Sequence, residues 1–155
     1  MVGWRVSKAR YTSPPSSAFD GEGARRRGGR WSPPGMRVAY ASESLALAAM
    51  EYFVNLDPTD GPSDLVSIKV EIPDEAVEHF DRSMLPANWR SYPSPRDLQR
   101  FGETWVKSAT SVCLVVPSAV LPEENNLLIN PAHLDFHLLH FSEPLEFRFD
   151  PRMWK

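Results

Sequence analysis

Apolar and polar positions alternate most regularly in the segment "LVSIKVEIP", residues 65–73. Period-2 alternation is typical of a strand that buries one face, so this segment predicts a half-buried strand that ends at Pro73. The expected buried face carries Val66, Ile68, Val70 and Ile72. Serine, lysine and glutamate stand between them and are expected to face outward.

Two other segments show helical spacing instead. "ESLALAAMEYFVNL" consists of strong helix formers and predicts a helix from about Glu43 to Asn55, with Ser42 as its N-cap. "SPRDLQRFGETWVKSA" predicts a second helix with Ser94 as N-cap and Pro95 at the first helical position. Its apolar positions at helical spacing are Leu98, Phe101 and Trp105.

The remaining apolar runs are short and predict further strands. "WRV", residues 4–6, and "RVAYAS", residues 37–42, predict one strand each, and "SVCLVVPSAVLP" predicts a buried strand interrupted at Pro117. "HLLHF" and "LEFRF" are expected to form a closing pair around Glu143 and Pro144. Because strands and helices mix without strict alternation, the pattern favours an α+β fold over a doubly wound sheet.

Length and composition fit one globular domain over residues 1–155. Apolar residues make up 42% of the chain, and no apolar run approaches the roughly 20 residues that cross a bilayer. The first residues do not resemble a secretory signal, and Cys113, the single cysteine, lies in the strand-like run "VCLVV". We therefore expect a cytoplasmic protein without a membrane segment, in which this thiol is buried.

Charge is unevenly distributed. The formal net charge is −3, yet "ARRRGGRWSPPG", residues 24–35, holds four arginines. A general nucleic-acid binder needs a larger basic surplus, so a local anion site is the better reading and direct nucleic-acid binding is not expected. Within the run, Arg30 is framed by glycine and by Trp31, which could anchor it, whereas residues 25–27 are expected to be surface charge. The alternative for the whole run is a solvated basic turn. The surrounding region, residues 11–35, is rich in Ser, Pro, Gly and Arg, so we expect no regular structure there.

Three further residues are candidates for chemistry, each with a plainer alternative. Tyr40 either packs within its strand or stacks on a flat heterocycle. Glu51 interrupts an apolar helical stretch and faces either solvent or a polar cleft, which the helical spacing does not decide. Ser118 follows the strand-interrupting proline and is either an edge-strand serine or a ligand contact.

Several standard sites are absent from the sequence pattern. His133, His137 and His140 lack companion ligands at metal-binding spacing, so no metal is expected. No nucleophile elbow surrounds Ser118, no P-loop lysine follows the glycines, and no helix pattern opens at residues 21–23 to make a dinucleotide fingerprint. From the residues alone, the chain is an α+β domain with a candidate nucleotide-phosphate pocket.

Read in order, seven segments carry a family resemblance from Trp4 to Arg152: "WRV", "DGEGARRRGGRWSPPGMRVAYAS", "LALAAME", "LPANW", "GETWVKS", "LVVPSAVLPEENNLLINPAH" and "FRFDPR". Together they resemble the RES domain, a family of toxins from bacterial toxin–antitoxin pairs. The family's GGRWN appears here as GGRWS, with Ser32 in the last place. The resemblance implies a split, mixed β-core with flanking helices, similar to the diphtheria-toxin-like ADP-ribosyltransferase fold.

The same resemblance implies an activity and a set of site residues. RES domains consume NAD⁺ by breaking the nicotinamide–ribose bond with water or phosphate as acceptor, and related members modify proteins by ADP-ribosylation. By motif, the catalytic residues would be Glu51, Arg30 and Ser118, and the residues binding NAD⁺ would be Arg5, Arg30, Tyr40, Ser118 and Asn126. The implied partners are a helix-turn-helix antitoxin that inserts into the active-site cleft and a second copy in a homodimer. A non-enzymatic binding module is the remaining alternative, and the acidic net charge disfavours it.

Overall fold

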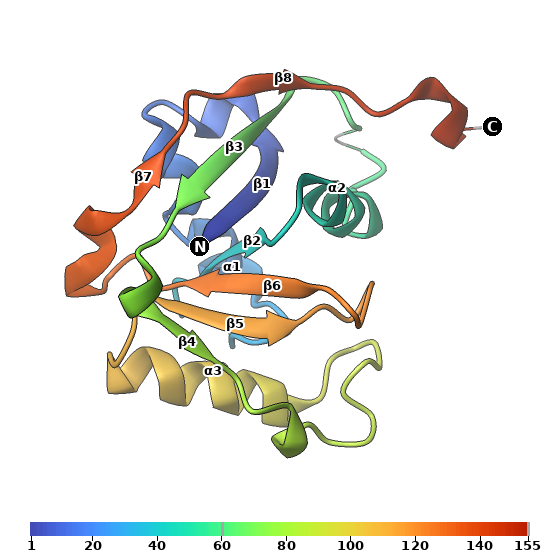
Figure 1. Ribbon diagram of the computed structural model, residues 1–155. Coiled ribbons are helices and arrows are strands. Elements are labelled where there is room, and N and C mark those ends of the chain that lie inside the picture. Colours follow the sequence, from blue (N-terminus) through green and yellow to red (C-terminus); the bar gives the residue numbers. More distant parts are fainter. Residues whose placement is uncertain (60, 155) are drawn as a thin grey trace.

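The computed structural model describes residues 1–59 and 61–154 (Figure 1). Its α-helices are α1 Glu22–Arg27, α2 Leu45–Val54 and α3 Arg96–Ser108. Its strands are β1 Val2–Lys8, β2 Ala39–Ser42, β3 Leu65–Glu71, β4 Val77–His79, β5 Cys113–Pro117, β6 Asn125–Ile129, β7 His140–Phe141 and β8 Leu145–Phe147. Short 3₁₀ helices are η1 Ala9–Tyr11, η2 Pro15–Phe19, η3 Asp74–Ala76, η4 Arg82–Met84, η5 Leu134–Leu138 and η6 Pro151–Trp154.

All eight strands belong to one curled, mixed sheet. Its order is β4-β5-β6-β2-β1-β3-β7, and β8 also pairs with β3. Neighbours run antiparallel except β4 and β5, which run parallel. The centre is narrow, since β1 and β2 meet at the pair Trp4 and Ser42, whereas β1 and β3 pair along seven positions. The predicted α+β class with a split, mixed β-core is confirmed.

Apolar side chains form separate clusters on the two faces of the sheet. Helix α3 packs through Leu98 and Trp105 on Leu114, Val116 and Leu128. Helix α2 covers another part of the sheet, where its Ala48 packs with Val6 and Leu65. The largest cluster contains Ala18, Phe19, Ala39, Ala41, Ile68, Val70, Ile72, Ala76, Val112, Cys113, Val115, Leu127, Ile129 and Leu139.

Several local predictions are confirmed. The alternating segment forms β3, with Ile68 and Val70 fully buried. Leu98 and Trp105 face the core from α3, as their spacing predicts. Cys113 is buried in β5, and burial raises the pKa of its thiol to about 12, so it is a packing residue at neutral pH.

Both predicted N-caps are wrong. Helix α2 is capped by Ser44, whose hydroxyl accepts from the Leu47 amide at 3.1 Å, and Ser42 remains in β2. Helix α3 starts after Pro95, which takes the cap position without a side-chain hydrogen bond, so Ser94 lies outside it. A serine beside a helix can serve either the helix or a neighbouring element, and sequence spacing does not distinguish the two.

The run 111–122 forms the buried strand β5 and leaves the sheet at Pro117, where the interruption is predicted. Two other predictions need correction. The region 11–35 is not devoid of regular structure, because it contains η2 and α1, and a helix does open at Glu22. β7 and β8 do not pair with each other; both pair with β3, because that strand is long enough to hold them one after the other.

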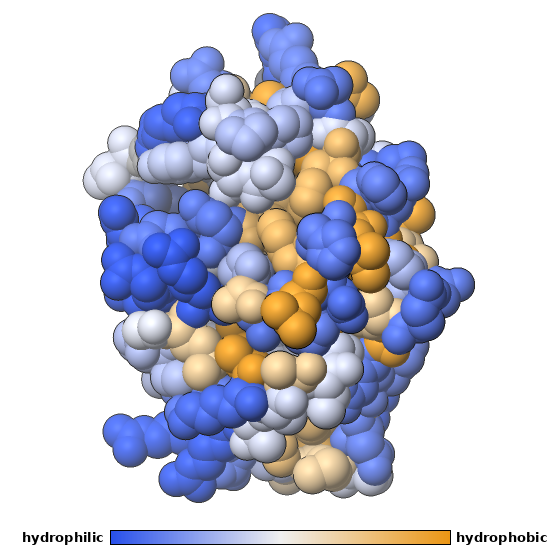
Figure 2. All heavy atoms as spheres, turned by 90° about the vertical axis from the view of Figure 1, so that its left-hand side faces the viewer, coloured by the Kyte–Doolittle hydropathy of each residue, from blue (hydrophilic) through white to orange (hydrophobic). Residues whose placement is uncertain are grey.

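One face of the molecule carries a broad apolar area. Figure 2 shows hydrophobic side chains across the middle of the face, with charged groups at its margins. Exposed apolar residues from elements on this side are Val2 of β1 and Leu134 and Leu138 of η5. In the described part of the chain, no helix is long and apolar enough to span a membrane.

Candidate active site

Glu51 lies on the inner face of α2. Leu47 and Ala48, one turn earlier on the helix, are buried against the sheet, and residues three and four apart share a helix face. Figure 1 shows α2 beside the turn that joins β5 and β6. The side chain of Glu51 therefore points toward polar groups of that turn and does not extend freely into solvent.

Two neutral side chains hold one oxygen of the Glu51 carboxylate. Ser118 Oγ donates to Glu51 Oε1 at 2.8 Å, and Asn126 Nδ2 donates to the same oxygen at 2.6 Å. Among the described residues, Oε2 has no hydrogen-bond donor. We call these three residues, together with Ser42, the glutamate site.

Each donor of the glutamate site is itself fixed. Ser118 is fully buried, and its hydroxyl oxygen accepts from the amides of Val120 and Leu121 at 3.1 Å, which directs its proton to Glu51. Ser42 Oγ donates to Asn126 Oδ1 at 2.8 Å, which leaves the Asn126 amino group facing the carboxylate. Because both donors are oriented before any ligand arrives, the carboxylate is held by a preorganised set of dipoles.

The start of α2 is tied to the same turn. Glu43 accepts from the amide and side chain of Asn125 at 2.9 and 3.1 Å, and Ser44 Oγ donates to Glu124 at 2.8 Å. These contacts join two segments about 80 residues apart in sequence, since Asn125 and Glu43 are separated by 82 positions. They fix the helix relative to the turn and therefore fix where Glu51 points.

Arg30 lies in a tight turn that β2 holds in place. The amide of Gly29 donates to Ser32 O at 2.8 Å, which closes the turn. The Tyr40 hydroxyl accepts from the Trp31 amide at 3.1 Å and lies 2.8 Å from Ser32 Oγ. Burial raises the pKa of Tyr40 to about 12, so the phenol keeps its proton for this contact. We call Gly28–Ser32 the arginine turn.

The glycines of this turn serve packing within the protein. A Cβ on Gly29 would lie 2.5 Å from the Tyr40 hydroxyl, and Gly28 adopts φ +74°. The Tyr40 side chain thus occupies the space beside Gly29. Ser32, which stands where the family has asparagine, is fully buried against the same hydroxyl.

Helix α3 supports the turn from the other side. Gln99 Nε2 donates to Gly29 O at 3.1 Å. A Cβ on Gly102 would lie 1.7 Å from Trp31 O, so the helix contacts the turn backbone directly. Trp31 is 2% exposed and meets the ring of Phe80 edge-on. The expectation that this tryptophan anchors the turn is confirmed.

Arg30 itself reaches across to the loop before α3. Its Nη1 donates to Trp89 O at 2.8 Å and to Ser91 O at 3.0 Å. Partial burial lowers its pKa, and the negative charge of Glu51 opposes that shift. The structure therefore brings Arg30 and Glu51 close enough for their charges to interact, while Nε and Nη2 of Arg30 have no acceptor among the described residues.

Arg5 is placed differently from the other candidates. Its neighbours Trp4 and Val6 pack toward α2, whereas its guanidinium lies 6.0 Å from the Phe19 ring in the other cluster. Nη1 donates to Tyr40 O at 2.5 Å, and the buried Nε has no hydrogen-bond partner in the described chain. Burial lowers its pKa, with Asp20 opposing. The structure thus joins Arg5 to the Tyr40 backbone and shows no contact with Glu51.

Sequence reasoning missed two features of the site. Ser42 was interpreted as a helix cap, and the strand β6 that carries Asn126 was not predicted as a strand, although "NNLLI" is an apolar run after two polar residues. The apolar run could have indicated the strand. Nothing local indicates that Ser42 and Asn126 are cross-strand partners, because that pairing follows from the register of β2 and β6.

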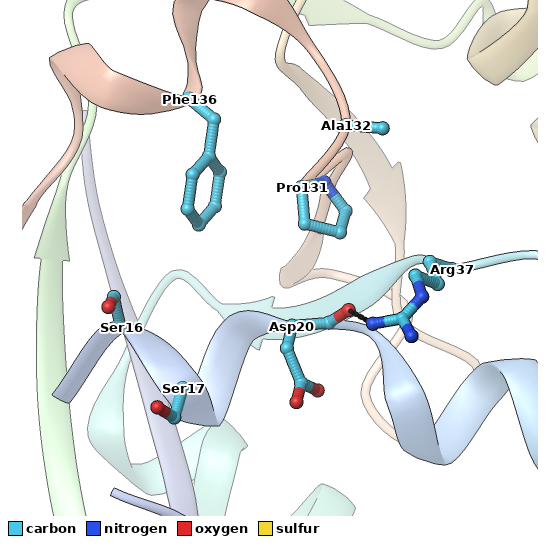
Figure 3. A pocket seen from close by; sticks show the side chains of 7 residues that line it. All are labelled: Ser16, Ser17, Asp20, Arg37, Pro131, Ala132 and Phe136. Atoms are coloured by element: carbon cyan, nitrogen blue, oxygen red, sulfur yellow. Dashed lines mark hydrogen bonds between the residues drawn. The ribbon is translucent and has the colours of Figure 1, made fainter. Parts of the chain in front are cut away.

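Two surface pockets lie away from the glutamate site and the arginine turn. One, of about 380 Å³, is drawn in Figure 3, where Phe136, Pro131 and Ala132 face Arg37 and Asp20. The other, of about 410 Å³, lies at the N-terminus beside Val2 and Leu138. Neither is lined by any of the six predicted site residues.

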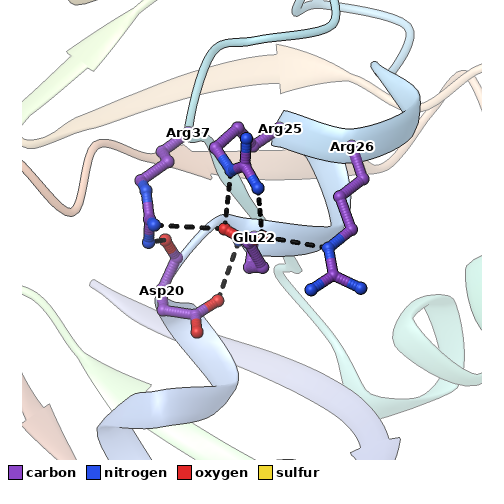
Figure 4. Close-up of polar contacts among 5 residues, drawn as sticks. All are labelled: Asp20, Glu22, Arg25, Arg26 and Arg37. Carbon is purple, nitrogen blue, oxygen red and sulfur yellow. Dashed lines mark hydrogen bonds and ion pairs between the residues drawn. The ribbon is translucent and has the colours of Figure 1, made fainter.

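Arg25 and Arg26 of the basic run and Arg37 beyond it form a surface cluster (Figure 4). Glu22 bonds Arg25 at 2.6 and 2.8 Å, Arg26 at 3.0 Å and Arg37 at 3.1 Å. We call these residues, with Asp20, the surface arginine cluster. Hydrogen bonds from Arg25 and then Arg26 lower the pKa of Glu22 to about 2. The expectation that Arg25 and Arg26 are surface charge is confirmed.

The histidines make local contacts instead of gathering. His133 Nε2 lies 2.8 Å from Ala109 O, and His137 Nδ1 lies 2.6 Å from Leu134 O. Within residues 1–59 and 61–154, no group of three or more His, Cys, Asp or Glu side chains is arranged to hold a metal ion.

The fold and the site together define an α+β protein with a carboxylate and an arginine fixed at one end of a curled, mixed sheet. The chain belongs to the RES domain family, which it matches over residues 3–150. It is 36% identical over 154 residues to Toxin Res of Yersinia enterocolitica, covering 99% of both chains. It is 35% identical over 153 residues to the Prs ADP-ribosylating toxin of Sphingobium sp., covering 97% of this chain and 94% of that protein.

A solved structure has a similar fold. It is the M. tuberculosis MbcT-MbcA toxin-antitoxin complex, which matches with a TM-score of 0.74 and 18% identity over 94% of this chain and 83% of that chain. At this identity the likeness concerns the fold alone.

Proposed function

We propose that this protein is the toxin of a toxin–antitoxin pair and that it consumes NAD⁺ by cleaving the bond between nicotinamide and ribose. The observation that carries this proposal is the Glu51 carboxylate. One of its oxygens is held by Ser118 and Asn126, and the other has no donor among the described residues. Such an arrangement suits stabilisation of a positive charge that develops during a reaction.

The chemistry requires that charge stabilisation. When the bond between the ribose anomeric carbon and the nicotinamide nitrogen breaks, its electron pair leaves with nicotinamide, which becomes a neutral pyridine. The ribose left behind has oxocarbenium character, as in glycoside hydrolysis. Oε2 of Glu51 is the oxygen that would face this centre. An oxygen of water or phosphate then bonds to the anomeric carbon, and its proton passes to solvent.

The other site residues would bind and orient the dinucleotide. Arg30 has unused N–H groups and would contact the pyrophosphate, because a guanidinium fork matches phosphate oxygens. Tyr40 would line the nicotinamide side while holding the arginine turn. Ser118 and Asn126 would keep Glu51 oriented. Arg5 donates to the carbonyl of Tyr40 and would therefore help to position that residue. A direct contact between Arg5 and NAD⁺ remains a prediction.

A second candidate function is transfer of ADP-ribose to a protein. It is supported by the printed name of the Sphingobium relative, Prs ADP-ribosylating toxin. Both reactions break the same bond and differ in the acceptor. Radiolabelled NAD⁺ would distinguish them, since transfer places the label on protein and hydrolysis leaves it in free ADP-ribose.

The proposed inhibitor is an antitoxin with a helix-turn-helix unit that inserts a segment into the cleft beside Glu51. The support is the toxin–antitoxin complex of similar fold. We also propose a homodimer, for which the apolar area around Val2, Leu134 and Leu138 offers a surface. Light scattering coupled to size exclusion tests the dimer, and co-purification with the product of the neighbouring reading frame tests the antitoxin.

The decisive experiment measures nicotinamide release from NAD⁺, with and without phosphate, by the wild-type protein and by Glu51→Gln. Glutamine keeps the shape and the hydrogen bonds to Ser118 and Asn126 but loses the charge. We expect release by the wild type and a large loss in the variant. Equal release by the two proteins, or none by either, would overturn the proposed function.

A further inference from the structure

The loop before α3 brings a second arginine to the arginine turn. Arg30 donates to the carbonyls of Trp89 and Ser91, which are the residues on either side of Arg90. The loop is anchored on the α3 side by Trp89, which packs against the cluster around Trp31. The backbone at Arg90 is therefore fixed by Arg30 itself.

Arg90 is also connected to the glutamate site. Its Nε donates at 3.0 Å to the carbonyl of Ala119, the residue after Ser118. Ser118 in turn donates to Glu51. The backbone on both sides of Arg90 is thus tied to Arg30, and the Arg90 side chain is tied to the segment whose Ser118 holds Glu51.

Arg90 has no carboxylate partner among the described residues. Five other exposed arginines do have one: Arg25 and Arg26 share Glu22, Arg100 has Asp97, Arg148 has Glu146 and Arg152 has Asp150. For Arg90 the structure shows only the Ala119 carbonyl, and both Nη groups lack an acceptor among the described residues. The positive charge of Arg90 also acts on Arg30, lowering its pKa.

Arg30 and Arg90 are joined through the loop backbone, and each has unused N–H donors. Two such guanidinium groups suit a doubly charged anion. We propose that Arg90 is a second phosphate-binding residue of this site, acting together with Arg30. The inference rests on the proposed function. The ligand is a phosphate group of the reaction, which can come from the pyrophosphate of NAD⁺ or from inorganic phosphate as acceptor.

The test uses the full-length protein and the variants Arg90→Gln, Arg90→Lys and Arg100→Gln. Arg100→Gln is the matched control, because it removes the same charge from an exposed position on α3 outside the site. Thermal unfolding of each variant checks that the fold is kept, which we expect because the Arg90 side chain is exposed. One measurement is calorimetric binding of ADP-ribose, which carries the pyrophosphate. The other is the dependence of nicotinamide release on phosphate concentration.

If the ligand is the pyrophosphate, Arg90→Gln weakens ADP-ribose binding about tenfold and raises KM for NAD⁺ to a similar extent with little change in kcat. Arg90→Lys recovers part of this, since it keeps the charge and loses the fork. If the ligand is inorganic phosphate, Arg90→Gln leaves ADP-ribose binding unchanged. In that case the variant's nicotinamide release no longer depends on phosphate concentration.

The inference is overturned if Arg90→Gln equals Arg100→Gln in both measurements while the wild type binds ADP-ribose and releases nicotinamide. A wild-type protein that does neither would instead overturn the proposed function, and this inference with it.

Discussion

The glutamate site and the surface arginine cluster are both built around one glutamate, and they differ in what surrounds it. Glu22 is ringed by arginines on the surface, and its bonds are ion pairs between side chains close in sequence or exposed. Glu51 is held by a serine and an asparagine that come from positions 67 and 75 residues away. In the surface arginine cluster, both carboxylate oxygens of Glu22 bond to arginines. In the glutamate site, only Oε1 of Glu51 has donors among the described residues.

That difference separates a cluster of exposed ion pairs from a carboxylate held by neutral donors. Exposed ion pairs are screened by water and salt, so they contribute little to stability. Neutral donors fixed by further bonds hold a carboxylate without neutralising it. Comparable substitutions in the two regions should therefore have very different effects.

The largest expected difference is between Glu51→Gln and Glu22→Gln. Loss of the Glu51 charge should lower kcat for nicotinamide release about 10³-fold, in the range known for removal of one electrostatic contact to a transition state. Glu22→Gln should leave kcat within about twofold, because that carboxylate contacts only surface arginines. Steady-state kinetics of both variants checks this, and similar losses in the two would remove the distinction between the regions.

Ser118→Ala should have the next largest effect. It removes the donor to Glu51 and leaves the amides of Val120 and Leu121 without their acceptor. We expect the free energy of unfolding to fall by about 3 kcal/mol, since buried unsatisfied groups are costly. Urea denaturation measures the fall, with Ser16→Ala as the control because the Ser16 hydroxyl makes no hydrogen bond with another described residue. A loss equal to that of the control would contradict the proposed arrangement of the turn.

A smaller effect is expected at the arginine turn. In Gly29→Ala, the added methyl group would lie 2.5 Å from the Tyr40 hydroxyl and displace the ring or the turn. Overpacking of this kind should destabilise the protein by about 2 kcal/mol and raise KM for NAD⁺. Gly23→Ala in α1 is the control, because its added Cβ meets nothing within 4 Å, and it should be neutral or slightly stabilising. Equal stability of the two variants would show that the Tyr40 side chain tolerates a methyl group at position 29.

The smallest effect concerns the pH dependence of the surface arginine cluster. The pKa of Glu22 is lowered to about 2 from its ordinary 4.5, so its ionised form is favoured by folding. Its contribution to stability is therefore fully present above pH 4.5 and is lost as the pH falls toward 2. The difference in unfolding free energy between wild type and Glu22→Gln should disappear in that window and shrink in high salt. A difference that persists at pH 2 would show that Glu22 acts through packing.

The charge pattern also explains why one arginine of the basic run differs from its neighbours. Arg25 and Arg26 lie on α1 within reach of Glu22 at helical spacing, a contact that a sequence can reveal. Arg30 lies in a turn whose direction is set by Trp31 in the core and Tyr40 in β2. Its contacts at Trp89 and Ser91 are about 60 residues away, and no local pattern indicates them.

Local chemistry in the sequence determined the elements that depend on near neighbours: the alternating strand β3, the helix α2, the apolar face of α3, the buried Cys113 and the anchoring Trp31. It also singled out Glu51 as a charge within an apolar helix. These features follow from short-range periodicity and burial, which the order of residues encodes directly.

Only the tertiary structure decided which way Glu51 faces and what holds it. Helical spacing leaves a residue at the edge of the apolar face undetermined, and the choice comes from donors on β6 and on the segment after β5. The same serine chemistry made Ser42 a plausible cap, while the register of β2 with β6 made it a partner of Asn126. Hydrogen bonds between distant segments depend on how strands pair and where helices pack, and that information is distributed over the whole chain.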